Sequence, residues 1–178
     1  NLCTEITLNT SADETAVCNL GSINYPRHVI NGCFDEAMVK QTVTTALRML
    51  DNVIDINFYP TPECEMSNFK HRPIGVGVQG LADVFMELEL DWESEPARKL
   101  NRDIFETIYY GALVESHALA VERRDNPATS YLPEEETNLP AGWKGAYSSF
   151  ASSPTALGLL QFDLWTKPAF RQQHFDWS

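Results

Sequence analysis

Three reactive side chains alternate at the start of the chain, in the run Asn1-Leu2-Cys3-Thr4-Glu5. In an extended segment alternate side chains point to the same side, so Asn1, Cys3 and Glu5 would form a row with neighbours about 6.5–7 Å apart. That row would offer a hydrogen-bonding amide, a thiol and a base to one small ligand. On a helix the same spacing would splay the three groups around the axis. If residues 1–5 are extended, the three side chains can therefore act together as a functional site.

A thiol near a carboxylate is also compatible with a cysteine-dependent hydrolase. Such an enzyme needs a histidine that takes the proton from the thiol. The four histidines, at positions 28, 71, 117 and 174, are scattered, and the sequence alone places none of them beside Cys3. A hydrolase therefore stays open as an alternative, as does a strand with a buried cysteine and an exposed acid.

The run from Gly75 to Gly80 matches the GxGxxG fingerprint of dinucleotide-binding proteins, and a helical pattern follows it. That fingerprint normally closes a buried apolar strand. Residues 68–73, which precede it, are mostly polar or basic and include Pro73. The pattern favours a tightly packed strand-to-helix turn in which glycine permits close approach of the backbone. A nicotinamide-dependent oxidoreductase remains the second alternative.

Composition indicates a soluble domain with a hydrophobic core, since 43% of the 178 residues are hydrophobic and 21% are charged. The net charge of −12 argues against a nucleic-acid surface. No apolar run is long enough to cross a bilayer. The chain has no CxxC or HxxxH pair, so a zinc site has little support. We expect no metal or cofactor in this chain. The dispersed cysteines indicate a reducing, intracellular compartment.

Periodicity predicts a mixed α/β chain. We expect residues 1–24 to be extended, residues 35–57 to be helical, and two prolines at positions 60 and 62 to stop regular structure. A strand or turn followed by a helix is predicted over residues 74–90, and a longer helix over 95–124 with Ser94 as its N-cap. Cys18 lies in a short apolar stretch, where a cysteine is more often a small core residue than a reactive one.

Several segments together resemble the large catalytic subunit of class I ribonucleotide reductase. They are residues 1–6, 16–20, 54–60, 71–83, 104–113, 153–154 and 160–165, in matching order and spacing over nearly the whole chain. Residues 125–152 depart from the family pattern and are predicted to be an irregular insertion. The resemblance implies that residues 1–178 are part of a catalytic ten-stranded α/β barrel with a central finger loop. A barrel cut at both ends would leave strand edges unpaired, so we expect poor independent folding.

The resemblance also implies a role for four residues. Cys3 would carry the thiyl radical, Glu5 would take the proton of the substrate 3′-hydroxyl, and Asn1 would hydrogen-bond the sugar hydroxyls. Cys18 would be one of two cysteines that reduce the substrate and end as a disulfide. The resemblance implies that its partner lies upstream of residue 1, and neither Cys33 nor Cys64 matches that position.

The implied activity is reduction of ribonucleoside diphosphates to deoxyribonucleotides. The family's partners are a small subunit with a di-metal centre and a tyrosyl radical, thioredoxin or glutaredoxin as reductant, and ATP or dNTP effectors. A homodimer and a cytoplasmic location are expected, with no nucleic-acid or membrane partner. Phosphate-binding and radical-transfer segments would lie beyond residue 178.

Overall fold

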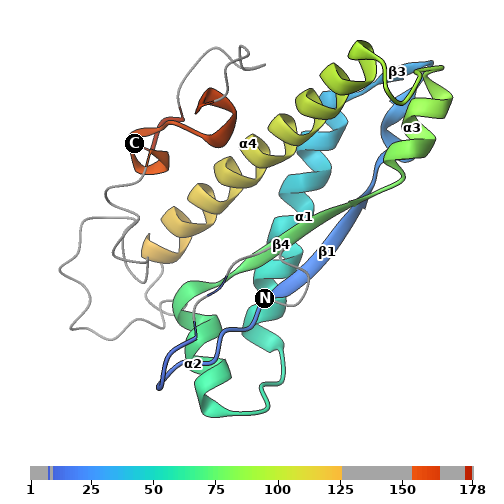
Figure 1. The fold of residues 1–178 in the computed structure, drawn as a ribbon. Helices are drawn as coiled ribbons and strands as arrows, with labels where there is room; N and C mark the ends of the chain where they lie inside the picture. Colours follow the sequence, from blue (N-terminus) through green and yellow to red (C-terminus); the bar gives the residue numbers. More distant parts are fainter. Residues whose placement is uncertain (1–7, 9, 126–153, 165–174, 178) are drawn as a thin grey trace.

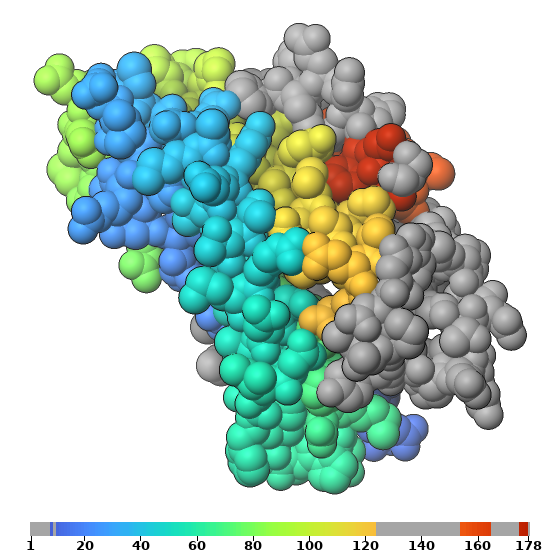
Figure 2. Space-filling model, turned by 180° about the vertical axis from the view of Figure 1, so that it is seen from behind, coloured from blue at the N-terminus to red at the C-terminus, as the bar shows by residue number. Residues whose placement is uncertain are grey.

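The computed structural model describes residues 8, 10–125, 154–164 and 175–177, which form a mixed α/β arrangement. Two long helices, α1 (Glu36–Ile56) and α4 (Glu95–Asp125), lie side by side and cover one side of a pair of strands (Figure 1). Seen from behind, the two helices run along the molecule and α2 (Pro62–His71) forms one end of it (Figure 2). No helix in these ranges is both long and apolar enough to cross a membrane.

Both long helices begin at side-chain caps. The Oδ1 atom of Asp35 accepts a hydrogen bond from the backbone N–H of Met38 at 2.9 Å, and Ser94 Oγ accepts from the N–H of Ala97 at 3.2 Å. Such caps satisfy backbone donors that the first helical turn leaves without a partner. The predicted helices over residues 35–57 and 95–124, and the predicted cap at Ser94, are confirmed.

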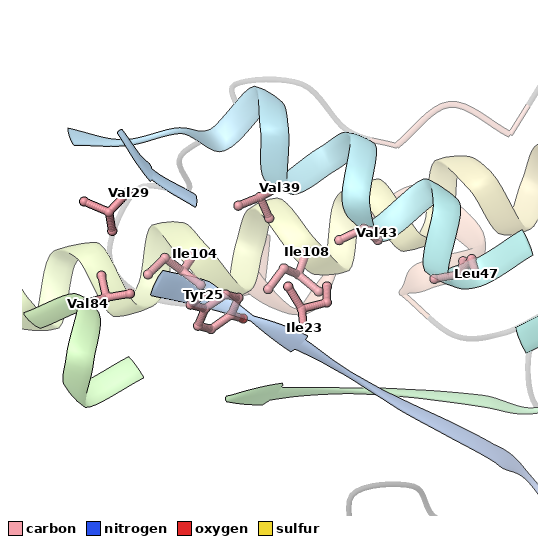
Figure 3. Packing of buried hydrophobic residues seen from close by; sticks show 9 residues of the cluster. All are labelled: Ile23, Tyr25, Val29, Val39, Val43, Leu47, Val84, Ile104 and Ile108. Carbon is pink, nitrogen blue, oxygen red and sulfur yellow. The ribbon is translucent and has the colours of Figure 1, made fainter. Parts of the chain in front are cut away.

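The hydrophobic core joins the long helices to the segment that follows the first strand (Figure 3). Its buried members recur at helical spacing on α1 and α4, which is the pattern of helices that bury one face. The cluster consists of Ile23, Tyr25, Val29, Val39, Val43, Leu47, Val84, Ile104 and Ile108. Farther along α4, Tyr109 packs on Phe162 and Tyr110 on Phe175, with ring centroids 6.2 and 5.6 Å apart.

The larger sheet pairs β1 (Asn19–Asn24) in parallel with β4 (Ile74–Gln79), from Asn19 opposite Ile74 to Asn24 opposite Gln79. A smaller antiparallel pair joins β2 (Val29–Ile30) to β3 (Cys33–Phe34). Three short 3-10 helices complete the described elements: η1 (Tyr25–His28), η5 (Thr155–Leu157) and η6 (Gln161–Leu164). Because the described ranges contain only these two-stranded sheets, they contain no closed barrel.

The β1–β4 sheet has one covered and one open face. A Cβ atom added at Gly21 would come 3.3 Å from Leu50 of α1, so this side of the sheet faces the helices. The other side, which we call the open face, carries the exposed residues Leu20, Ser22, Asn24, Gly77 and Gln79. Leu20 is 55% exposed.

The expected stop at the two prolines is wrong in part, because α2 begins at Pro62. Thr61 is its N-cap and accepts a hydrogen bond from the N–H of Cys64 at 3.4 Å. Proline is tolerated at the first helical position, where its missing N–H would have no intrahelical partner. The helix ends at His71, and its C-cap residue Arg72 has a left-handed φ of 45°.

The GxGxxG run forms a strand and a tight turn, as predicted. Its first two glycines lie inside β4, and Gly80 makes the turn into α3 (Leu81–Glu87) with a φ of 75°. A Cβ atom at Gly80 would come 2.5 Å from Pro26 Cδ, so glycine is required there by both conformation and space. In a dinucleotide site the fingerprint follows the strand, whereas here it lies largely within it.

Candidate active site

The described residues place Cys18 but not the opening row. Asn1, Cys3 and Glu5 lie outside the described residues, and their arrangement stays a prediction. Cys18 is half-buried and directly precedes β1. Of the other cysteines, Cys33 is exposed, and Cys64 is buried beside the Thr61 hydroxyl at 3.4 Å.

Cys18 lies at the start of the paired strands. The N–H of Asn19 donates to the carbonyl of Pro73 at 3.4 Å, which continues the β1–β4 ladder back to this end. Since side chains alternate along a strand, Cys18 is on the same side as Leu20 and therefore at the edge of the open face. Extending the alternation of β1 back by this one residue predicts that the thiol points away from the α1 side of the sheet.

Glu14 connects the segment before Cys18 to the end of α2. Its carboxylate accepts hydrogen bonds from Lys70 Nζ at 2.8 Å and from His71 Nε2 at 2.7 Å. The bond from Lys70, followed by that from His71, holds the pKa of Glu14 below its ordinary value. Next to it, the N–H of Thr15 donates to the carbonyl of Glu63 at 3.3 Å. These contacts fix the segment against α2.

An ion cluster around the buried carboxylate of Asp51 ties the α2–β4 junction to the two long helices. Arg72 donates to Asp51 at 2.7 Å and to Asp55 at 2.8 Å, while Arg123 of α4 contacts both of these α1 carboxylates. Burial works to raise the pKa of Asp55, but the hydrogen bonds from the two arginines outweigh it and hold the pKa below its usual range. Asp55 therefore stays charged at neutral pH, and its contacts with the two arginines weaken as the pH falls toward that lowered pKa.

Removing Arg72 should be costly, because the Asp51 side chain is only 5% exposed. We expect Arg72→Met to lower the free energy of unfolding by about 3 kcal/mol, as is typical when one partner of a buried ion pair is lost. The measurement is urea-induced unfolding of the full-length protein. Arg98→Met is the matched control, since Arg98 and its partner Glu95 are both 64% exposed. Equal unfolding midpoints for the two variants would contradict the expected role of the cluster.

Sequence reasoning missed Glu14, Lys70, His71 and the ion cluster. One available signal was the basic run Lys70-His71-Arg72 at the end of a segment that begins with Thr61-Pro62, a combination typical of a capped helix. Arg123, near the end of α4, contacts both Asp51 and Asp55 of α1. The carboxylate partners lie too far away in the sequence to be recognised from a local pattern.

A family model described as "Ribonucleotide reductase, barrel domain" matches residues 1–178. The chain is 47% identical over 165 residues to the ribonucleoside-diphosphate reductase large subunit of variola virus, covering 93% of this chain and 19% of that protein. The large subunit of Trypanosoma brucei brucei is also 47% identical over 165 residues, with 17% of its length covered. Subunit alpha of Chlamydia pneumoniae is 43% identical over 163 residues, with 14% covered.

The chain therefore belongs to the ribonucleotide reductase barrel-domain family. It corresponds to a part of the large subunit of ribonucleoside-diphosphate reductase, and it spans less than a fifth of the length of the variola virus relative. The family resemblance read from the sequence is confirmed.

Proposed function

We propose that the full-length protein containing this chain reduces ribonucleoside diphosphates to deoxyribonucleoside diphosphates by radical chemistry. The observation that carries the proposal is the family match over residues 1–178, together with relatives 47% identical that are named as the large subunit of this enzyme. In this proposal the chain supplies part of a ten-stranded α/β barrel with a central finger loop. Residues 125–152 are an insertion in it.

The proposed reaction explains the residue types of the opening row. A thiyl radical at Cys3 takes a hydrogen atom from the 3′-carbon of the sugar, because S–H and C–H bonds are close in strength. Glu5 removes the proton of the 3′-hydroxyl, which helps the carbon radical to expel the 2′-hydroxyl. Asn1 orients the sugar through hydrogen bonds to its hydroxyls. The leaving group takes up a proton from an acidic thiol and departs as water.

Cys18 and a second cysteine outside this chain supply the two electrons and become a disulfide. The hydrogen atom that Cys3 took is then returned to the 3′-carbon, so the radical is regenerated. The placement of Cys18 at the edge of the open face supports this role, since the opposite face of the sheet is covered by α1. The rest of the barrel would cover the open face and exclude water from the radical.

The proposal includes the partners that this chemistry requires. A small subunit with a di-metal centre and a tyrosyl radical would generate the thiyl radical, and thioredoxin or glutaredoxin would reduce the disulfide after each turnover. We further propose regulation by ATP and dNTPs, a homodimer of the large subunit, and a cytoplasmic location. The net charge of −12 supports the absence of a nucleic-acid partner.

An activity assay of the full-length protein tests the proposal. We expect repeated turnover to deoxyribonucleoside diphosphate only when the small subunit and a dithiol reductant are both present. Ester hydrolysis without the small subunit would instead support the cysteine hydrolase. Dinucleotide binding that is lost in Gly77→Val would support the nicotinamide enzyme, and either result would overturn the proposal.

A further inference from the structure

Cys18 is the last residue of a segment, residues 10–18, that forms no helix or strand and leads into β1. Hydrogen bonds between residues of this segment hold it in a turn. Thr10 Oγ1 accepts from the N–H of Ala16 at 3.2 Å, and Ser11 Oγ accepts from the N–H of Glu14 at 3.2 Å. Side-chain-to-backbone bonds of this kind order a turn locally, but they do not fix it relative to the rest of a fold. Its position must therefore be set by contacts outside the segment.

The Glu14 carboxylate provides such contacts. It lies between Lys70 and His71 in the last turn of α2, where cations are favoured by the helix dipole. The side chains of Glu14 and His71 are 16% and 13% exposed, so their contact is better shielded from water and salt than a surface pair. The Thr15 N–H adds a backbone bond to Glu63 of the same helix.

The other flank of Cys18 is held by the same junction. Asn19, the next residue, donates to the carbonyl of Pro73, which follows directly on the run Lys70-His71-Arg72. Arg72 in turn is anchored to Asp51 and Asp55 of α1. Cys18 is thus bracketed by two contacts to one short stretch, residues 70–73, which is itself tied to the core.

We propose that Glu14 is a positioning residue for Cys18, because its contacts with Lys70 and His71 set the position of the thiol on the open face. The inference rests on the proposed function, in which this thiol must meet both the substrate and a second cysteine. A disulfide requires the two Cα atoms to lie about 4.4–6.8 Å apart, so a small shift of the segment impairs the step. Glu14 itself takes no part in the bond changes.

The test uses the full-length protein with its small subunit and compares Glu14→Gln with Glu65→Gln. Glu65 is an exposed carboxylate on α2 and serves as the matched control. We expect Glu14→Gln to lower kcat by about tenfold to a hundredfold, as misplacement of a reacting group does, with KM for the ribonucleoside diphosphate nearly unchanged. Glu65→Gln should keep the wild-type kcat.

A second measurement separates positioning from general damage. After mixing of prereduced enzyme with substrate and no external reductant, the rate of disulfide formation at Cys18 should fall in Glu14→Gln by the same factor as kcat. Combining Glu14→Gln with His71→Gln should lower kcat little further than either change alone, because both remove one contact. A wild-type kcat in Glu14→Gln would overturn the proposal. So would a loss of activity in which the rate of disulfide formation at Cys18 is unchanged. An inactive wild-type protein would instead refute the proposed function.

Discussion

Cys3→Ser in the full-length protein abolishes deoxyribonucleotide formation if Cys3 carries the thiyl radical. A serine O–H bond is far stronger than an S–H bond, so a radical cannot be passed to this position and returned from it. We expect no product above background, with the affinity for the ribonucleoside diphosphate retained because the side chains are similar in size. The measurement is product formation with the small subunit present, together with a binding titration.

Cys33→Ser provides the control for loss of a thiol as such. Cys33 lies in the small β2–β3 pair and is exposed, and the proposal gives it no role. This variant should turn over like the wild type. Normal turnover in Cys3→Ser would show that the row at the start of the chain does not carry the chemistry.

Cys18→Ser should fail at a later step. Hydrogen abstraction by Cys3 remains possible, but the two electrons that complete the reduction are missing. We expect deoxyribonucleotide formation to be lost while the radical of the small subunit decays when substrate is added. In Cys3→Ser the same radical should persist, because no hydrogen atom is taken from the substrate.

Electron paramagnetic resonance of the small-subunit radical, followed after addition of substrate, distinguishes these two outcomes. A radical that persists in Cys18→Ser would indicate that Cys18 acts before hydrogen abstraction or outside the reaction. Repeated turnover in Cys18→Ser with a dithiol reductant present would exclude it from the reducing pair.

The long helices could be predicted because their signals are local. Val39, Val43 and Leu47 recur every four residues along α1, and a capping residue precedes both α1 and α4. The helix α2 was missed because Pro62 is read as an interruption, although proline is compatible with the first turn. The local sequence does not show whether a proline such as Pro62 interrupts regular structure or begins a helix.

The contacts around Cys18 could not be predicted, because their partners are distant in the chain. Glu14 and His71 are 57 residues apart, and Asp51 and Arg123 are 72 apart. Their pairing depends on how α2 and α4 pack against other elements, which periodicity does not encode. Cys18 itself was identified by resemblance, since its apolar neighbours indicated an ordinary core residue.

The central claim is that Cys18 is oxidised while the substrate is reduced. Mass-spectrometric mapping of cysteines in the full-length protein, after one turnover without external reductant, tests it most directly. We predict that Cys18 is recovered in a disulfide with a cysteine outside residues 1–178, in an amount equal to the deoxyribonucleotide formed. Product formed while Cys18 stays reduced, or is bonded to Cys33 or Cys64, would contradict the account.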